Sequence, residues 1–150
     1  MLRLKSLKEL NLQSHPFITC SELLCDLMQP IENYFGFNHF EVMKVFMDGS
    51  VFMCSSHPEW LSEFIKGGLY LHGEQRFAAA SYRKKKIIST LSSDEEFLWQ
   101  RKKESLGLYN VICFIEPVAD GCEFYYFGTT NENQEIMNFA ISNLELLEKC

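Results

Sequence analysis

The sequence predicts an α/β fold: a three-layer α/β/α sandwich around a mainly antiparallel sheet of about five strands. Two observations and one general rule predict it. Two pairs of apolar segments rich in Val, Ile, Phe and Tyr are each joined by a short turn, which favours antiparallel hairpins. Segments with apolar residues at three- and four-residue steps flank these hairpins and indicate amphipathic helices. Helices placed between hairpins can cover both faces of one sheet.

The first helix is predicted from an apolar stripe that begins at Cys20. Thr19 and Glu22 form a capping box that places its start. Pro30 lies inside the stripe and is expected to kink or break the helix, and Gly36 is expected to end it. The stripe consists of Cys20, Leu23, Leu24, Leu27, Met28, Ile31, Tyr34 and Phe35.

The first hairpin follows this helix. Residues 38–47 are rich in Val, Phe and Met, with Glu41 and Lys44 interleaved, which is typical of a strand. Asp48-Gly49 is a strong signal for a two-residue turn. Residues 51–54 are then the returning strand.

Two further helices are predicted between the hairpins. Residues 56–59 indicate a capped start with Pro58 in the first turn, and the short helix that follows is expected to stop at Gly67-Gly68. Its apolar residues are Trp60, Leu61, Phe64 and Ile65. Ser93 and Glu96 form another capping box, which predicts a helix over 94–104 that ends at Gly107.

The stretch 69–91 between these two helices carries conflicting signals. Residues 77–80 favour a helix by propensity, because three of them are alanine. Residues 86–91 contain β-branched side chains and favour a strand. Both readings stay open for this stretch.

The second hairpin and a last helix complete the chain. Residues 110–118 and 122–128 flank a turn at 119–121 and are nearly continuous in apolar residues, which predicts a central hairpin covered on both faces. A closing helix is expected from about Asn133. Its apolar stripe is Ile136, Met137, Ala140, Ile141, Leu144 and Leu147.

Length, charge and cysteine usage bound the class of protein. The 150 residues are expected to form a single domain, 1–150, with 1–16 as an N-terminal extension. A formal charge of −6 argues against a dedicated nucleic-acid binder. No window approaches the roughly 20 apolar residues of a membrane span, and the N-terminus lacks the apolar run of a signal peptide. The six cysteines lack C-x-x-C spacing and are expected to be reduced thiols, which indicates a cytoplasmic protein.

The sequence contains no catalytic or metal-binding motif. The four histidines are His15, His39, His57 and His72, and none is paired at the spacing of a helical metal site. We therefore expect no enzyme, no cofactor and no metal. The basic runs 83–86 and 101–103 are interpreted as a solvated face, or as the partners of acidic groups within the chain or on another protein.

Several segments together, by their order and spacing, resemble the N-terminal sensor domain of LuxR-type transcriptional regulators. They are Phe46–Ser50, Ser55–Phe64, Leu69-Tyr70, Trp99, Leu106–Cys113 and Phe124–Gly128. The resemblance covers roughly residues 20–149. It implies an autoinducer-binding domain, whose α/β/α plan is similar to that of PAS and GAF sensor domains.

The resemblance implies a site between the sheet and its helices that holds an acyl-homoserine lactone. Trp60 matches the tryptophan whose indole N–H bonds the lactone carbonyl, Phe64 stands where the family has a tyrosine, and Trp99 matches a second aromatic residue against the lactone ring. The expected ligand-binding residues are Phe52, Trp60, Phe64, Tyr70, Trp99 and Tyr126.

This sequence departs from the family pattern at three places. Residues 70–75 lack the Asp-Pro pair whose carboxylate accepts the ligand's amide N–H, Phe64 lacks a hydroxyl, and Val111 stands in place of a glycine. A buried amide without its acceptor costs about 1–3 kcal/mol. A different small molecule, or none, therefore remains open.

The sequence thus predicts a ligand-sensing regulatory domain of a LuxR-type, quorum-sensing-like regulator, with a small amphipathic ligand such as an acyl-homoserine lactone, or an orphan sensor. The alternative is a protein-interaction or dimerisation module with a self-filled core and no ligand. We expect a homodimer and no membrane contact. DNA is expected as a partner only through a helix-turn-helix domain that this chain does not contain.

Overall fold

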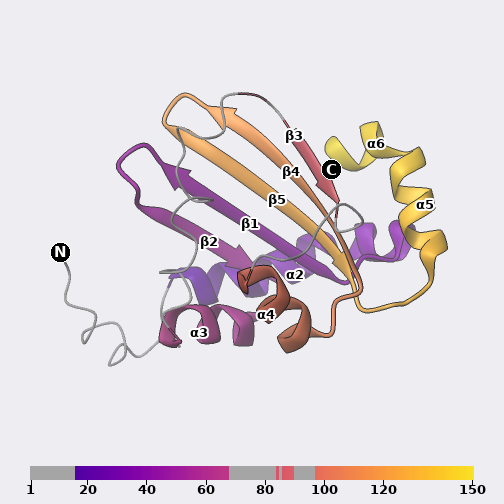
Figure 1. Cartoon of the computed structure of the whole chain (residues 1–150), viewed down its shortest axis with the longest axis horizontal. Helices are drawn as coiled ribbons and strands as arrows, with labels where there is room; N and C mark the ends of the chain where they lie inside the picture. The colour runs from indigo at the N-terminus through magenta and orange to yellow at the C-terminus, as the bar shows by residue number, and fades with distance from the viewer. Residues whose placement is uncertain (1–15, 68–83, 85, 90–96) are drawn as a thin grey trace.

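The described residues form one antiparallel sheet with helices beside it. The computed structural model describes residues 16–67, 84, 86–89 and 97–150. Its five strands lie in the order β2-β1-β5-β4-β3, and every neighbouring pair is antiparallel (Figure 1). The strands are β1 (His39–Phe46), β2 (Val51–Ser55), β3 (Lys86–Ser89), β4 (Asn110–Val118) and β5 (Gly121–Thr129). The predicted α/β class and antiparallel sheet are confirmed.

Strand alternation divides the core between the two faces of the sheet. On what we call the α3 face, Val111, Cys113 and Ile115 of β4 pack in one buried cluster with Trp60 and Leu61. On the opposite side, which we call the α2 face, the alternate β4 residues pack with the other helices. That cluster contains Ile31, Phe35, Phe37, Phe40, Ile112, Phe114, Phe127, Met137, Ala140 and Leu147.

Helices therefore contribute to both clusters. They are α2 (Pro16–Phe35), α3 (Pro58–Lys66), α4 (Phe97–Leu106), α5 (Gln134–Ser142) and α6 (Leu144–Glu148). In Figure 1, α3 and α4 lie together in front of the sheet, and α2 passes behind it. The complete three-layer sandwich stays a prediction, since residues 68–83 and 90–96 lie outside the described part.

The two hairpins form as predicted. β5 lies between β1 and β4 in the middle of the sheet, so the second hairpin is central. In the first hairpin, Gly49 has φ +84°, a conformation that glycine adopts without strain. The Asp48 carboxylate accepts hydrogen bonds from the backbone N–H and the hydroxyl of Ser50, at 2.8 and 2.6 Å, and fixes the turn.

The first helix starts earlier than predicted, and of the two outcomes expected at Pro30, a kink or a break, the break does not occur. α2 begins at Pro16, so the expected capping box at Thr19 and Glu22 is wrong. The helix also continues through Pro30 to its end before Gly36, where φ is +84°. Ile31 and Phe35 are buried in the cluster on the α2 face, and this packing holds the last turns in place.

The start of α3 is capped differently from the prediction. The N-cap residue is His57, and its side chain makes no capping hydrogen bond. The Ser56 hydroxyl accepts from the backbone N–H of Phe40 at 2.9 Å instead, so it ties β1 to the loop before α3. Pro58 occupies the first turn, as predicted.

The boundaries of the remaining elements follow local chemistry. α4 ends before Gly107, as predicted, and the expected capping box at 93–96 lies outside the described residues. β3 confirms the strand preference of residues 86–89, whereas 77–80 lie outside the described part.

The predicted last helix is two helices. Asn143 separates α5 from α6, and its side-chain amide donates to the Phe139 carbonyl at 2.8 Å, which competes with the helical backbone bonds. Ile141 is 44% exposed, so its expected place in the buried stripe is wrong.

Candidate functional site

Three of the predicted ligand-binding residues lie together on the α3 face. Trp60 and Phe64 of α3 are 2% and 7% exposed, and their ring centroids are 6.1 Å apart. Tyr126 of β5 is buried in the same cluster. Trp60, Leu61 and Phe64 share one side of α3 because they are one and four residues apart, and Pro58 starts the helix so that this side meets the sheet.

Of the other three predicted residues, one lies on the opposite face of the sheet and two are not tested by the described residues. Phe52 pairs with Lys44 and alternates with Met53, which belongs to the cluster, so Phe52 points to the α2 face. Tyr70 lies outside the described residues. Trp99 belongs to α4, and its side chain lies outside the described part.

A buried ion pair lies among these aromatic rings. The Lys102 Nζ is 2.7 Å from Glu41 Oε2, and the two side chains are only 5% and 4% exposed. The same Nζ lies 4.4 Å from the Tyr126 ring centroid and 5.9 Å from the Trp60 ring centroid. Burial would raise the pKa of Glu41, but the Lys102 ammonium and His39 outweigh it and lower this pKa to about 2. Glu41 is therefore a carboxylate at neutral pH.

Two histidines lie beside the Glu41 end of this ion pair. His39 Nε2 lies 3.7 Å from Glu41 Oε2, and His39 Nδ1 lies 2.9 Å from His57 Nδ1. One of the two imidazoles must carry its proton on Nδ1 and donate it to the other. Burial is the main reason why the pKa of His39 falls to about 4. His39 is therefore neutral at pH 7.

The Trp60 indole is a buried donor without a hydrogen-bond partner among the described residues. Its Nε1 atom is inaccessible to solvent, and no described group accepts its hydrogen. Leaving a buried donor unpaired costs about 1–3 kcal/mol, whereas a carbonyl oxygen placed there would remove that cost. The α3 face thus combines aromatic walls, a free N–H donor and a charged pair, which suits recognition of a carbonyl or amide group.

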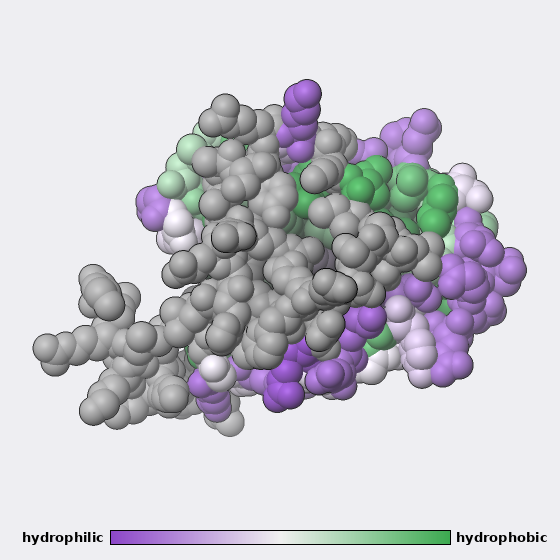
Figure 2. Space-filling model, in the orientation of Figure 1, coloured by the Kyte–Doolittle hydropathy of each residue, from purple (hydrophilic) through white to green (hydrophobic). Residues whose placement is uncertain are grey.

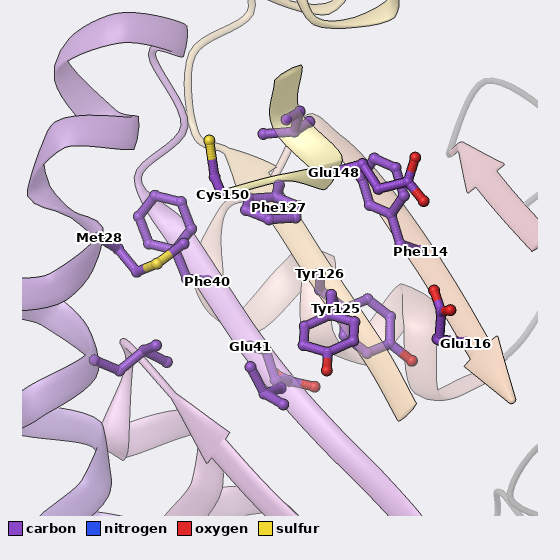
Figure 3. A pocket seen from close by; sticks show the side chains of 13 residues that line it. Met28, Phe40, Glu41, Phe114, Glu116, Tyr125, Tyr126, Phe127, Glu148 and Cys150 are labelled. Carbon is purple, nitrogen blue, oxygen red and sulfur yellow. The ribbon is translucent and has the colours of Figure 1, made fainter. Parts of the chain in front are cut away.

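A pocket lies on the opposite side of the sheet. It has a volume of about 380 Å³ and is lined by α2, the central strands and the C-terminal residues (Figure 3). The lining residues are Leu24, Met28, Phe40, Glu41, Val42, Phe114, Glu116, Tyr125, Tyr126, Phe127, Leu147, Glu148 and Cys150. Of the predicted ligand-binding residues only Tyr126 is among them. Figure 2 shows apolar surface on the side of the molecule where Figure 1 draws β3 and α6. Ile87 of β3 and Leu146 of α6 are each 44% exposed.

The sequence interpretation missed Glu41 and Lys102, although both carry a signal. Glu41 is in phase with Met43 and Val45 along β1, and these alternate residues face the core. Lys102 is four residues before Leu106, which packs against the same cluster. The expected intrachain acidic partners of residues 101–103 exist, but the side chain of Lys102 is buried rather than solvated.

The described part of the chain holds few other candidate centres. All six cysteines are free. No three His, Cys, Asp or Glu side chains among the described residues are placed to hold a metal ion. None of the helices in the described ranges has the length and apolarity to cross a bilayer.

Among solved structures, the chain is similar to CepR2 from Burkholderia cenocepacia, an N-acylhomoserine-lactone-dependent LuxR-family transcription factor. The TM-score is 0.62 at 12% sequence identity, and the match covers 97% of this chain and 89% of that chain. The fold resembles that of a LuxR-family autoinducer-binding domain. No protein-family model matches the sequence, and no curated protein does. The likeness to a LuxR-family fold that the sequence implied is thus supported by a structural neighbour, whereas the three-layer sandwich and membership of the family stay predictions.

Proposed function

We propose that this chain is the ligand-sensing regulatory domain of a LuxR-type regulator, that it is not an enzyme, and that it binds a small amphipathic molecule such as an acyl-homoserine lactone on the α3 face. One observation supports the proposal: within the described ranges the buried Trp60 indole N–H has no hydrogen-bond partner, in a fold that resembles an autoinducer-binding domain. A ligand carbonyl at this N–H removes an unsatisfied donor from the core.

The charged pair supplies the polar groups that the family would draw from Asp-Pro. Glu41 offers a carboxylate that accepts a ligand amide N–H, and Lys102 offers an ammonium for a second carbonyl. Phe64 and Tyr126 supply apolar wall for an acyl chain. Phe52, Tyr70 and Trp99 are not needed for this arrangement.

The regulatory consequence follows from linkage. A ligand that binds only the folded domain raises its stability, and in a regulator that gain would be coupled to dimerisation and to DNA binding by a helix-turn-helix domain outside this chain. We place such a regulator in the cytoplasm.

A second candidate function is favoured by one observation. The Lys102 ammonium already lies over the Trp60 and Tyr126 rings, where a ligand head group would sit. A core filled in this way suits a protein-interaction or dimerisation module without a ligand. Leu23, Leu27 and Tyr34 of α2 are 63%, 73% and 59% exposed and would supply apolar contact area for a second protein.

Thermal unfolding with acyl-homoserine lactones of graded acyl length tests the proposal. A ligand at a hundred times its Kd adds about 2.7 kcal/mol to the free energy of unfolding. For a chain of this size each kcal/mol raises Tm by about 2–4 °C, so the expected shift is several degrees.

Two variants locate the effect. Trp60→Phe keeps an aromatic ring but removes the N–H, and it should weaken ligand binding about ten- to a hundredfold. Tyr125→Phe, on the α2 face, is the matched control and should leave the affinity unchanged. No shift with any lactone, together with a concentration-dependent dimer, would favour the interaction module.

A further inference from the structure

Lys102 is a lysine placed among aromatic rings rather than in solvent. Its side chain is 5% exposed, and it belongs to α4, which lies with α3 in front of the sheet (Figure 1). Its Nζ atom is 4.4 Å from the Tyr126 ring centroid and 5.9 Å from the Trp60 ring centroid, and both rings belong to the buried cluster of the α3 face. Lysine amines in such desolvated places are the ones that proteins use as nucleophiles toward carbonyl groups.

A carboxylate that can take up the lysine proton is in direct contact with it. Glu41 Oε2 lies 2.7 Å from Lys102 Nζ, and the Glu41 side chain is 4% exposed. Burial alone raises the pKa of Glu41, and the Lys102 charge is the main cause that lowers it to about 2. Because this cause disappears when Lys102 becomes neutral, the carboxylate regains its basicity as the amine is released. Glu41 is thus the proton acceptor that an amine nucleophile needs.

The surroundings of Lys102 also favour an imine over the ammonium ion. An ammonium has three N–H donors, and keeping it buried requires partners for all of them. An iminium nitrogen has a single N–H, for which the Glu41 carboxylate is enough, and it keeps the positive charge opposite that carboxylate. Imine formation from an aldehyde releases water, so the exclusion of solvent from this cluster favours the product as well.

We propose that the α3 face binds an aldehyde with an apolar body covalently, as an imine on Lys102. Glu41 takes a proton from the ammonium, and the free Nζ electron pair forms a C–N bond to the aldehyde carbon. The carbonyl oxygen takes a proton from this nitrogen and becomes a hydroxyl group. Glu41 then returns its proton to the hydroxyl, the C–O bond breaks and water leaves. In sum, one ammonium and one aldehyde give one iminium and one water, with no change in charge and no oxidation or reduction.

The neighbouring side chains suit this class of ligand. Trp60 and Phe64, whose ring centroids are 6.1 Å apart, and Tyr126 supply apolar surface for an alkyl or aryl body. The Trp60 indole N–H, which no described group accepts, is a donor in the same cluster for the aldehyde oxygen. The inference rests on the ligand-binding role proposed above for the α3 face, and it names a class of ligand that this face holds by a covalent bond.

Octanal is the probe, and cyanoborohydride at neutral pH reduces its imine to a stable secondary amine. Mass spectrometry of the whole chain with peptide mapping is expected to place the first octyl group on Lys102, rather than on the N-terminal amine or an exposed lysine. Exposed lysines are ammonium ions at this pH and should carry little of the label. At limiting concentration, each methylene removed from the aldehyde should lower the labelling of Lys102 about fourfold, because less apolar surface is buried.

The variant Lys102→Arg separates the chemistry from the packing. A guanidinium keeps the positive charge opposite Glu41 and can stack on the same rings, but it forms no imine under these conditions, so this variant should lose the label. Lys103→Arg, at the next residue of the same helix, is the matched control and should keep it. Peptide mapping of the wild-type chain assigns the adduct even if Lys102→Arg does not fold.

Three results would overturn the proposal. They are a Lys102 that octanal leaves unlabelled, a label spread equally over Lys102 and the exposed lysines, and a folded Lys102→Arg protein that is labelled like the wild type. Failure of the imine and failure of the lactone proposal are distinguishable, because a Tm shift with lactones needs no covalent bond. A lactone shift without label on Lys102 overturns only the imine, whereas label on Lys102 without any lactone shift supports the imine and contradicts the lactone.

Discussion

Replacing the Glu41 carboxylate with an amide is expected to destabilise the fold far more than an ordinary loss of an ion pair. Glu41→Gln keeps the shape of the side chain but leaves the Lys102 ammonium buried without its counter-charge 2.7 Å away. The Tyr126 and Trp60 rings offer only partial compensation through their faces. The ammonium then has to lose its proton or draw water into the core.

The magnitude follows from the burial of both partners. Removing one member of a buried pair typically costs about 3–5 kcal/mol. Replacing both partners with apolar residues of similar volume is often neutral or stabilising. Among the wild type, Glu41→Gln and the double variant Glu41→Leu with Lys102→Met, the Glu41→Gln protein should therefore have the lowest free energy of unfolding. The double variant should recover most of the free energy that Glu41→Gln loses.

Urea unfolding measures these free energies, and the chain offers a matched control. Glu63 pairs with Arg101 at 2.9 Å, but these side chains are 30% and 50% exposed. Exposed pairs contribute about 0–1 kcal/mol, so Glu63→Gln should cost about that much. Equal losses in Glu41→Gln and Glu63→Gln, or a double variant as unstable as Glu41→Gln, would refute the reasoning.

Three further predictions concern stability. His39 has a pKa lowered from 6.5 to about 4, so the unfolded chain binds its proton first and stability should fall as pH drops from 6.5 toward 4. His39→Gln should flatten that part of the urea-midpoint profile, and an unchanged profile would contradict the assignment. Gly121→Ala places a Cβ against the Val45 carbonyl and should lower the free energy of unfolding by about 2–3 kcal/mol. A Tm equal to that of the wild type would contradict this, because it would mean that β1 and β5 move apart at that point without cost. Asn133→Ala removes the N-cap hydrogen bond of α5, which is 3.0 Å long, and should lower the free energy of urea unfolding by about 1 kcal/mol. Asn138→Ala is the control and should cause no such loss. Equal losses in the two variants would refute the capping role of Asn133.

Most elements of the fold could be predicted from local signals in the sequence. The Asp48-Gly49 turn, the β4–β5 hairpin and the stop of α2 at Gly36 each depend on residues close in sequence. Errors arose where a distant partner decided the outcome. The Ser56 hydroxyl bonds the N–H of Phe40 on β1 rather than capping α3, and no local pattern reports that bond.

The candidate site was predictable in part. The family resemblance placed Trp60, Phe64 and Tyr126 together, and the structure does so. It did not indicate Lys102, because a basic run on a helix is usually solvated, and only the packing of α4 against the sheet buries this side chain. The pocket on the α2 face was equally invisible, since its walls come from five elements far apart in sequence.

The most direct test of a lactone-binding α3 face is the NMR signal of the Trp60 indole N–H. The chain has two tryptophans, so the spectrum holds two indole signals, and the Trp60→Phe variant assigns them. During titration with acyl-homoserine lactones, the account predicts that the Trp60 signal moves saturably downfield as its proton bonds a carbonyl oxygen. A Trp60 signal that stays in place throughout the titration would contradict it.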